Sequence, residues 1–237
     1  MENPEIKDEN KKKDKIYNVK FIIIGETKVG KTSIINQYTK QIFEEEFFTT
    51  MATDKSIKEI EIKGKKVKLE IWDTIGQEKY RAVNKIFMKN TQIALLVYDI
   101  TDRKSFDDLN EWYENFIKIN EKEKAIIGVA ANKSDLYEDR VVEEKEGKNF
   151  AKSKNIEFFE TSSKDYDSIN IVFETLSEKY LDTLCDVVEK EKESRKTIGI
   201  NKQDHIDKNN DGNENDNNGK KKKKNHGVRK YFLYLIY

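Results

Sequence analysis

The segment GETKVGKT, residues 25–32, constrains the fold of this chain more than any other stretch. It follows the continuous apolar run VKFIII (19–24), which predicts a buried strand, and it leads into TSIINQYTK (32–40), which predicts a helix. A glycine-rich turn of the form GxxxxGK[ST] between a strand and a helix is typical of a phosphate-binding loop. Glycines let backbone amides surround phosphates, and the helix N-terminus adds a partial positive charge. The segment therefore predicts a phosphate site where a strand ends.

Two side chains of this loop carry the chemistry that a nucleotide requires. Lys31 is placed to reach the terminal phosphates, and the Thr32 hydroxyl can ligate Mg²⁺. The alternative is a chance glycine turn before a helix, which accounts poorly for the strand and the helix on either side. A phosphate loop alone leaves open which base is bound and what happens to the phosphate.

The other apolar segments predict a sheet covered by helices. Residues 55–62 and 67–72 alternate in polarity around Gly64, which is the pattern of a hairpin. Further strands are predicted at residues 93–100, 125–131 and 156–160. Apolar residues recur at helical spacing in two stretches: Phe106, Leu109, Tyr113, Phe116 and Ile117, then Ile169, Phe173, Leu176, Tyr180 and Leu184. Strands that alternate with helices predict an α/β fold with a mainly parallel sheet, helices on both faces, and ligands bound in the loops that follow the strands.

Length and composition limit what surrounds this core. The 237 residues suit one domain with tails, and the charged residues 1–17 and the asparagine- and lysine-rich residues 202–230 predict disorder. Since 45 lysines and arginines balance 45 acidic residues, charge gives no reason to expect nucleic-acid binding. Cys185 is the single cysteine, which excludes an internal disulfide. No apolar run approaches the roughly 20 residues of a membrane span, and the N-terminus lacks the apolar core of a signal peptide, so we expect a cytoplasmic protein.

The segment ANKSD, residues 131–135, follows a predicted strand and indicates which base is bound. Guanine presents N1 and its exocyclic amine as neighbouring donors, and a fixed carboxylate such as Asp135 can accept from both. Adenine has no such pair of donors, so the segment favours guanine. The four letters NKSD alone fit an ordinary polar turn equally well, but their place after a strand and downstream of a phosphate loop favours the base-binding interpretation.

With these two motifs in place, residues 18–186 resemble a small GTPase of the Ras superfamily. The resemblance implies a P-loop GTPase fold with a mostly parallel six-stranded sheet and one antiparallel strand, preceded by a disordered extension and followed by a disordered polybasic tail, residues 187–237. It implies GTP or GDP and Mg²⁺ as ligands. FEEEFFTTMATD, residues 43–54, resembles the first switch. Thr50 would ligate Mg²⁺ and sense the γ-phosphate, and Phe43 would pack on the guanine.

The second switch and the last base loop resemble the same family. In WDTIGQE, residues 72–78, Asp73 would hold a magnesium-bound water, the Gly76 amide would touch the γ-phosphate, and Gln77 would orient the attacking water as the catalytic residue. ETSSK, residues 160–164, resembles the last loop around the base. The full set of nucleotide-binding residues implied by the resemblance is Gly25, Lys28, Val29, Gly30, Lys31, Thr32, Ser33, Phe43, Thr50, Gly76, Asn132, Lys133, Asp135, Ser162, Ser163 and Lys164. The metal residues are Thr32, Thr50 and, through water, Asp73.

Within the superfamily the chain resembles the Rab branch. KLEIWDT, KYRAV and LVYDIT are similar to Rab signatures, and Trp72 and Phe87 match two aromatic residues that Rab proteins present to effectors. The alternative is that both rings only pack in the core. MATDK departs from the usual IGVDF, so that Lys55 stands where a phenylalanine is expected and Ala52 replaces a glycine. Lysine cannot supply that aromatic surface, which leaves the set of effectors open.

Two further departures bear on hydrolysis. Ile75 stands where the family usually has alanine, and it adds bulk and a stiff β-branch to a segment that must move when the γ-phosphate leaves. Thr27 occupies a loop position where bulk tends to interfere with hydrolysis. These residues predict slow intrinsic hydrolysis and a long-lived GTP form. The alternative is that neighbouring residues have adjusted and both substitutions are neutral.

The C-terminal tail lacks the cysteines that Rab proteins usually prenylate. Lys220–Lys224 and the apolar final residues could bind an anionic membrane surface weakly, on the cytosolic face of endomembranes, or the lysines could form a solvated linker. A third alternative is a translated intron, because the codons available to Val228 and Arg229 include GTAAGA, the form of a splice donor. We expect Cys185 to be a packed or idle thiol and not a lipid anchor.

Three kinds of function fit these features to different degrees. The first is a GTP-hydrolysing switch that recruits membrane-trafficking effectors and depends on an exchange factor and a GTPase-activating protein. The second is a scaffold that holds GTP or GDP with little turnover. The third is a P-loop kinase for a small molecule, which NKSD and WDTIGQ disfavour because neither an acceptor site nor an arginine-bearing lid is evident.

Overall fold

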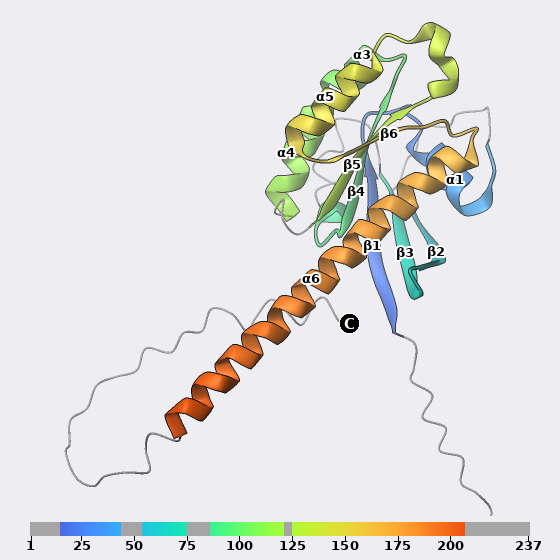
Figure 1. The fold of residues 1–237 in the computed structure, drawn as a ribbon. Coiled ribbons are helices and arrows are strands. Elements are labelled where there is room, and N and C mark those ends of the chain that lie inside the picture. Colours follow the sequence, from blue (N-terminus) through green and yellow to red (C-terminus); the bar gives the residue numbers. More distant parts are fainter. Residues whose placement is uncertain (1–14, 44–53, 75–85, 121–124, 207–237) are drawn as a thin grey trace, which may run out of the picture. The chain divides into compact units, whose positions relative to one another are not determined.

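The computed structural model describes residues 15–43, 54–74, 86–120 and 125–206, with side chains described as far as residue 186. The chain divides into two compact units, Met1–Val188 and Glu189–Tyr237. The first unit holds the sheet and the helices that cover it (Figure 1). In the second unit, the described residues are the helical ones that end at Ile206.

Six strands form one sheet with the order β2-β3-β1-β4-β5-β6. Their bounds are β1 Ile16–Ile24, β2 Asp54–Ile62, β3 Lys65–Asp73, β4 Ile93–Asp99, β5 Ile126–Asn132 and β6 Glu157–Glu160. Among the described strand pairs, β2–β3 alone is antiparallel. Lys63 and Gly64 join these two strands with φ angles of 50° and 71°, the consecutive left-handed conformations that a tight hairpin turn requires. The predicted mostly parallel six-stranded sheet with one antiparallel strand is confirmed.

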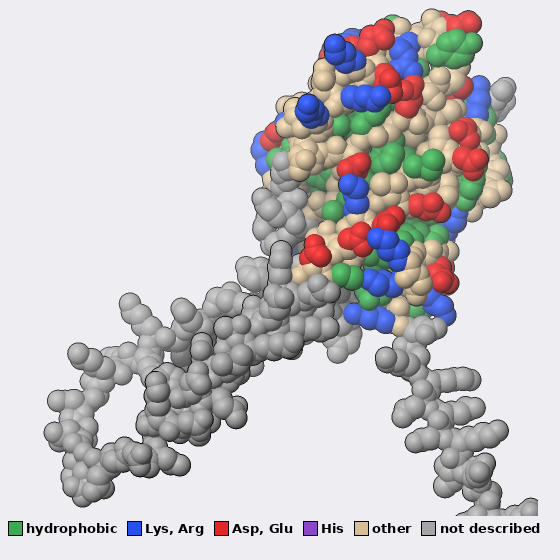
Figure 2. Space-filling view, viewed as in Figure 1, with side chains coloured by type: hydrophobic (Ala, Val, Ile, Leu, Met, Phe, Trp, Pro, Cys, Tyr) green, Lys and Arg blue, Asp and Glu red, His purple; other side chains and the backbone are tan. Residues whose placement is uncertain are grey.

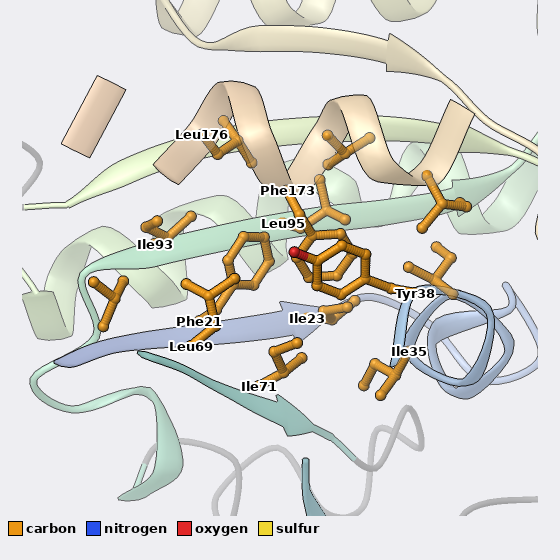
Figure 3. Packing of buried hydrophobic residues seen from close by; sticks show 14 of the residues in the cluster. Phe21, Ile23, Ile35, Tyr38, Leu69, Ile71, Ile93, Leu95, Phe173 and Leu176 are labelled. Carbon is orange, nitrogen blue, oxygen red and sulfur yellow. The ribbon is translucent and has the colours of Figure 1, made fainter. Parts of the chain in front are cut away.

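Helices cover both faces of the sheet. Their bounds are α1 Lys31–Lys40, α3 Arg103–Asp107, α4 Leu109–Asn120, the 3₁₀ helix η3 Ser134–Asp139, α5 Glu144–Lys154 and α6 Tyr166–Ile206. α1 and α6 lie on one face, and α4 and α5 lie on the other. Alternate residues of β1 divide between these layers, since Phe21 and Ile23 belong to the first core cluster and Ile22 and Ile24 to the second. Figure 3 shows the first cluster, where Phe21 and Ile23 face Tyr38 of α1 and Phe173 of α6.

The structure differs from the sequence-based expectations in the helices between β4 and β6. The helical spacing from Phe106 to Ile117 predicts one helix, but the structure has two, α3 and α4. They meet at Asp108, which caps the end of α3 and whose carbonyl accepts from Glu111 in the first turn of α4. Helix α5 was not predicted, since its buried residues include the small Gly147 and Ala151 and give little apolar periodicity.

Two elements extend into segments that were expected to be disordered, while the expected domain bounds stay a prediction. β1 begins at Ile16, inside the segment expected to be disordered, and α6 continues to Ile206, past the expected end of order at residue 186. Residues 189–196 are mainly glutamate, lysine and arginine, which form helices well although they offer little to bury. No helix in the described part of the chain is long and apolar enough to cross a membrane.

Candidate nucleotide-binding site

The predicted phosphate loop follows β1 and ends at the first turn of α1. Gly30 caps α1 with a φ angle of 97°, and Lys28 also has a left-handed φ angle of 64°. A Cβ at Gly25 would lie 2.2 Å from the carbonyl oxygen of Val97, and one at Gly30 would lie 2.3 Å from Nδ2 of Asn132. Both positions therefore require glycine, because β4 and the base-binding segment approach the loop closely.

Lys31 is buried inside this loop. Its Nζ donates to the carbonyl oxygens of Gly25 at 3.0 Å and of Glu26 at 2.6 Å. Burial lowers the pKa of Lys31 to about 8, although the charges of Asp73 and Glu26 act in the opposite direction. A buried ammonium group that costs desolvation is stabilised further by an anion, so this position suits the terminal phosphates of a nucleotide.

Thr32 and Asp73 form a pair of oxygens that fits Mg²⁺. The Thr32 hydroxyl donates to Oδ2 of Asp73 at 2.6 Å, which joins the start of α1 to the end of β3. The other carboxylate oxygen of Asp73, Oδ1, is buried with no hydrogen-bond partner among the described residues. Burial raises the pKa of Asp73 above its ordinary range, and Thr32 and Lys31 only partly offset this. Hard oxygen ligands that lack a partner are what a divalent cation satisfies, directly or through its waters.

Asn132 joins the phosphate loop to the segments predicted to bind the base. Its side chain is fully buried at the end of β5, and Nδ2 donates to the carbonyl oxygen of Val29 at 2.9 Å and to Oγ of Ser163 at 3.4 Å. Its Oδ1 accepts from the Thr161 hydroxyl at 3.2 Å. One amide thus holds three loops that are far apart in the sequence, and this explains why the predicted NKSD and ETSSK segments meet.

Two neighbours hold the carboxylate of Asp135. Oδ1 accepts from the Ser162 hydroxyl at 2.7 Å, and Oδ2 lies 3.0 Å from Nζ of Lys164. Burial alone would raise the pKa of Asp135, but these hydrogen bonds and the Lys164 charge outweigh it and hold the pKa below its ordinary range. Asp135 is therefore ionised at neutral pH and accepts hydrogen bonds.

A pocket of about 260 Å³ opens between these loops. The lining residues are Gly30, Ser33, Phe43, Asn132, Lys133, Asp135, Leu136, Ser163 and Lys164. Nζ of Lys164 lies 5.6 Å from the centroid of the Phe43 ring, so an aromatic face and a cation stand together at the wall. Lys133 adopts a left-handed conformation, and its Nζ lies 2.5 Å from Oδ2 of Asp99 at the end of β4. The pocket therefore offers a planar apolar surface beside a carboxylate.

Two contributors to the site were not predicted from the sequence. Leu136 lines the pocket and directly follows the NKSD motif, a position that could have suggested it. Glu26 lies within the phosphate loop, where its Oε1 accepts from the indole Nε1 of Trp112 on α4 at 3.1 Å, with both residues buried. The indole directs this carboxylate toward α4. No sequence signal links two residues so far apart in the chain.

Trp72 and Phe87, the predicted effector residues, lie together. Their ring centroids are 5.6 Å apart, and both half-buried rings pack against the second core cluster. Lys55 stands opposite Trp72 on β2, and its Nζ lies 5.6 Å from the centroid of the Trp72 ring. Nζ of Lys20 lies 5.1 Å from the same centroid. The residue that replaces the expected phenylalanine thus places a cation on the aromatic pair.

Several predicted residues lie outside the described residues. They are Thr50 and Ala52 of the first switch and Ile75, Gly76 and Gln77 of the second. Cys185 is half-buried on α6, where its Sγ lies 2.8 Å from Nζ of Lys65. Its expected role as a packed or idle thiol stays a prediction.

Comparison with known proteins agrees with this geometry. A family model described as the Ras family matches residues 20–182. The Ras-related protein RabQ of Dictyostelium discoideum is 39% identical over 165 residues, which cover 70% of this chain and 80% of the relative. The Ras-related protein SEC4 of Saccharomyces cerevisiae is 33% identical over 182 residues, or 77% and 80% of the two chains, and the Ras-related protein Rab-10 of Caenorhabditis elegans is 36% identical over 179 residues, or 76% and 88%. The chain therefore belongs to the Ras family and is a small GTPase close to the Rab proteins.

Proposed function

We propose that this chain is a Rab-like switch that binds and hydrolyses GTP and recruits effectors of intracellular membrane trafficking while GTP is bound. The observation that carries the proposal is a pocket lined by Asp135, whose carboxylate is ionised, by Phe43, and by Gly30 and Ser33 at the phosphate loop, which Asn132 joins to the loop of Asp135. A base, a ribose and a chain of phosphates require such a continuous site.

Guanine preference rests on Asp135. Its carboxylate is ionised, and a guanine held in the pocket would donate from N1 and from its exocyclic amine to the two oxygens. Phe43 and the stem of Lys164 offer flat apolar surface to the base. Adenine would leave the carboxylate without these donors, and the loss of hydrogen bonds to a charged acceptor discriminates strongly.

The phosphate end of the site would hold the metal. Thr32 and Asp73 would hold Mg²⁺, with Asp73 acting through a bound water, and Thr50 would complete the set when GTP is present. The metal supplies neutralisation of charge on the phosphate oxygens. Lys31 would contact the terminal phosphates, and Gln77 would orient the attacking water. A GTPase-activating protein commonly accelerates such hydrolysis by about 10³ to 10⁵.

The partners follow from the same cycle. An exchange factor would release GDP, and effectors would bind the GTP form at a surface that includes Trp72 and Phe87. We place the chain in the cytoplasm, with peripheral attachment to the cytosolic face of endomembranes if the basic segment Lys220–Lys224 meets anionic lipid. These assignments rest on the similarity to Rab proteins and on the charge of the tail.

Single-turnover hydrolysis tests the proposal. The full chain would be loaded with GTP and Mg²⁺, and release of phosphate followed for the parent, Ile75→Ala and Gln77→Leu. We expect measurable hydrolysis by the parent, several-fold faster hydrolysis by Ile75→Ala, and slower hydrolysis by Gln77→Leu with unchanged nucleotide affinity. Equal rates for the parent and Ile75→Ala would show that the isoleucine is accommodated.

The same experiment separates the switch from the scaffold. A parent that retains GTP but releases no phosphate, with or without Ile75, would identify a GTP- or GDP-binding scaffold with little turnover. Retention of ATP in preference to GTP would overturn both and would return the phosphate-loop kinase to consideration.

A further inference from the structure

Lys58 lies outside the nucleotide loops, yet it contacts a segment on each side of the base pocket. From β2, its Nζ donates to the carbonyl oxygen of Tyr38 at 2.6 Å and lies 3.7 Å from the centroid of the Tyr38 ring. The same Nζ lies 5.4 Å from the centroid of the Tyr166 ring and 3.4 Å from the Tyr166 hydroxyl oxygen. One half-buried ammonium group therefore connects three elements: β2, α1 and α6.

The contact with Tyr38 fixes the end of α1. The last four carbonyls of a helix lack helical partners, and a cation there interacts favourably with the helix dipole. The Tyr38 ring stacks on Phe173 of α6 with centroids 3.7 Å apart and an interplanar angle of 3° (Figure 3). The chain leaves α1 after Lys40 and reaches Phe43 at the pocket wall within three residues. The position of Phe43 thus depends on the end of α1 that Lys58 holds.

The contact with Tyr166 fixes the start of α6. Tyr166 is the first residue of this helix and follows Lys164 by two positions. Its hydroxyl donates to Oδ1 of Asn170 at 3.3 Å, which anchors it to the next turn. Lys164 reaches both Asp135 and the Phe43 ring. Lys58 therefore connects the two chain segments that carry Phe43 and Lys164, the facing residues of the pocket wall.

We propose that Lys58 is a positioning residue that sets the rate at which guanine nucleotide leaves the pocket. The inference rests on the proposed function. Lys58 keeps the segments of Phe43 and Lys164 at contact distance, so its loss lets the wall of the base pocket open more often. Among the described strands β2 lies at the edge of the sheet and pairs with β3 alone, so a partner that displaced β2 would loosen the same wall. Through Lys58, a change at this edge of the sheet would therefore alter the rate of nucleotide release.

Lys63 provides a matched control on the same hairpin. Its Nζ lies 2.7 Å from Oε1 of Glu178 and 3.0 Å from Oδ2 of Asp182, so it also joins the hairpin to α6. Glu178 is 12 residues beyond Tyr166, about 18 Å along the helix axis and away from the pocket. If Lys58 only fastened the hairpin to α6, loss of either lysine should change the nucleotide dissociation rate equally.

The experiment follows dissociation of a fluorescent GDP analogue from the full chain in excess GDP. We expect Lys58→Met to raise the dissociation rate about tenfold, Lys58→Arg to stay within about twofold of the parent because it keeps the cation, and Lys63→Met to match the parent. Single-turnover hydrolysis of bound GTP should be unchanged in Lys58→Met, since Lys58 does not touch the phosphate loop in the described contacts. Equal dissociation rates for Lys58→Met and the parent, or an equal rise in Lys63→Met, would overturn the proposal.

Tyr166→Leu keeps the proposal testable if Lys58→Met does not fold. It removes the α6 side of the connection and should by itself raise the dissociation rate. Where Lys58→Met folds, the double variant should show less than the product of the two single effects. If the parent retains GDP and Tyr166→Leu releases it at the same rate as the parent, the role of Lys58 is overturned but the proposed function is not. A parent that retains no guanine nucleotide overturns the proposed function, and this inference with it.

Discussion

At the scale of the residue, Asp135 illustrates how neighbours prepare a side chain for its ligand. Its carboxylate is partly buried, which by itself would favour the protonated form, but Ser162 and Lys164 hold the ionised form through hydrogen bonds and charge. The same contacts fix the direction of both oxygens. Asp135 therefore presents a rigid acceptor, which is what the proposed recognition of guanine requires.

Asp135→Asn should weaken guanine binding while leaving the phosphate loop intact. An amide presents one acceptor and one donor, so it would clash with one guanine donor and lose a hydrogen bond to a charged group, worth about 1.5 to 3 kcal/mol, or about 10- to 150-fold in affinity. Competition of GDP and xanthosine diphosphate against a fluorescent analogue measures this. The variant should tolerate xanthine better than the parent does, and an unchanged preference for guanine would show that Asp135 does not contact the base.

Guanine affinity should be insensitive to pH in the mildly acidic range. The pKa of Asp135 in the folded chain lies below its ordinary value of about 3.9, so the ionised form, and the interactions that depend on it, are present above that value and are lost only as the pH falls through the lowered pKa. Titrations of GDP between about pH 5 and about pH 7, below the pKa of about 8 of Lys31, should give constant affinity in the parent. A loss of affinity centred near pH 6 that is absent in Asp135→Asn would mean that burial, and not the contacts with Ser162 and Lys164, determines the pKa of Asp135.

At the scale of the element, α6 is held by packing on one face of the sheet. Phe173 is fully buried, stacks on Tyr38 of α1, and lies 4.6 Å from Phe21 of β1 between ring centroids. Ile171, two positions earlier on the same helix, is 54% exposed. The two positions therefore separate the contribution of core packing from that of helix propensity.

Phe173→Ala should lower the free energy of unfolding by about 3 to 5 kcal/mol, because it leaves a cavity between α1, α6 and the sheet. Ile171→Ala should change it by no more than about 0.5 kcal/mol. Urea denaturation of the GDP-bound chain, followed by circular dichroism, measures both. Similar values for the two variants would mean that α6 is not packed through Phe173.

The predicted helices were wrong where tertiary contacts, and not the apolar pattern of the sequence, set the bounds of a helix. The segment from Arg103 to Asn120 carries one apolar periodicity, but Asp102 accepts a hydrogen bond from the Lys104 amide and begins a short first helix, and Asp108 interrupts the run. Helix α5 was missed because its buried residues include the small Gly147 and Ala151, so the segment carries few large apolar side chains. The strands were predicted well, since each is a continuous or alternating apolar run that must be buried.

At the scale of the whole molecule, the compact unit Met1–Val188 contains all the described site residues. Acidic and basic side chains are mixed over the described surface seen in Figure 2, with no continuous patch of one sign. We therefore expect membrane attraction to come from the Lys220–Lys224 segment and not from the face seen in Figure 2.

The full chain should sediment with vesicles that contain phosphatidylserine, because five lysines contribute up to about 1 kcal/mol each near an anionic surface. Replacement of all five lysines by glutamine keeps the length of the tail and should abolish sedimentation, as should salt at about 0.5 M, which screens the attraction. Equal binding to neutral vesicles would show that the lysines act as a solvated linker and that the apolar end governs any attachment.

The sequence by itself determined the type of fold, the phosphate loop and the base motif of this protein. A buried parallel sheet requires continuous apolar strands, and a phosphate loop requires glycines at positions where a Cβ would collide, so both requirements are local and appear in the order of the residues. Only the tertiary structure decided which side chains hold the site together. Asn132 binds two other loops, Trp112 directs Glu26, and Lys58 contacts both α1 and α6. These residues are far apart in the chain and meet only when it folds, so the spacing of residues in the sequence does not predict the contacts.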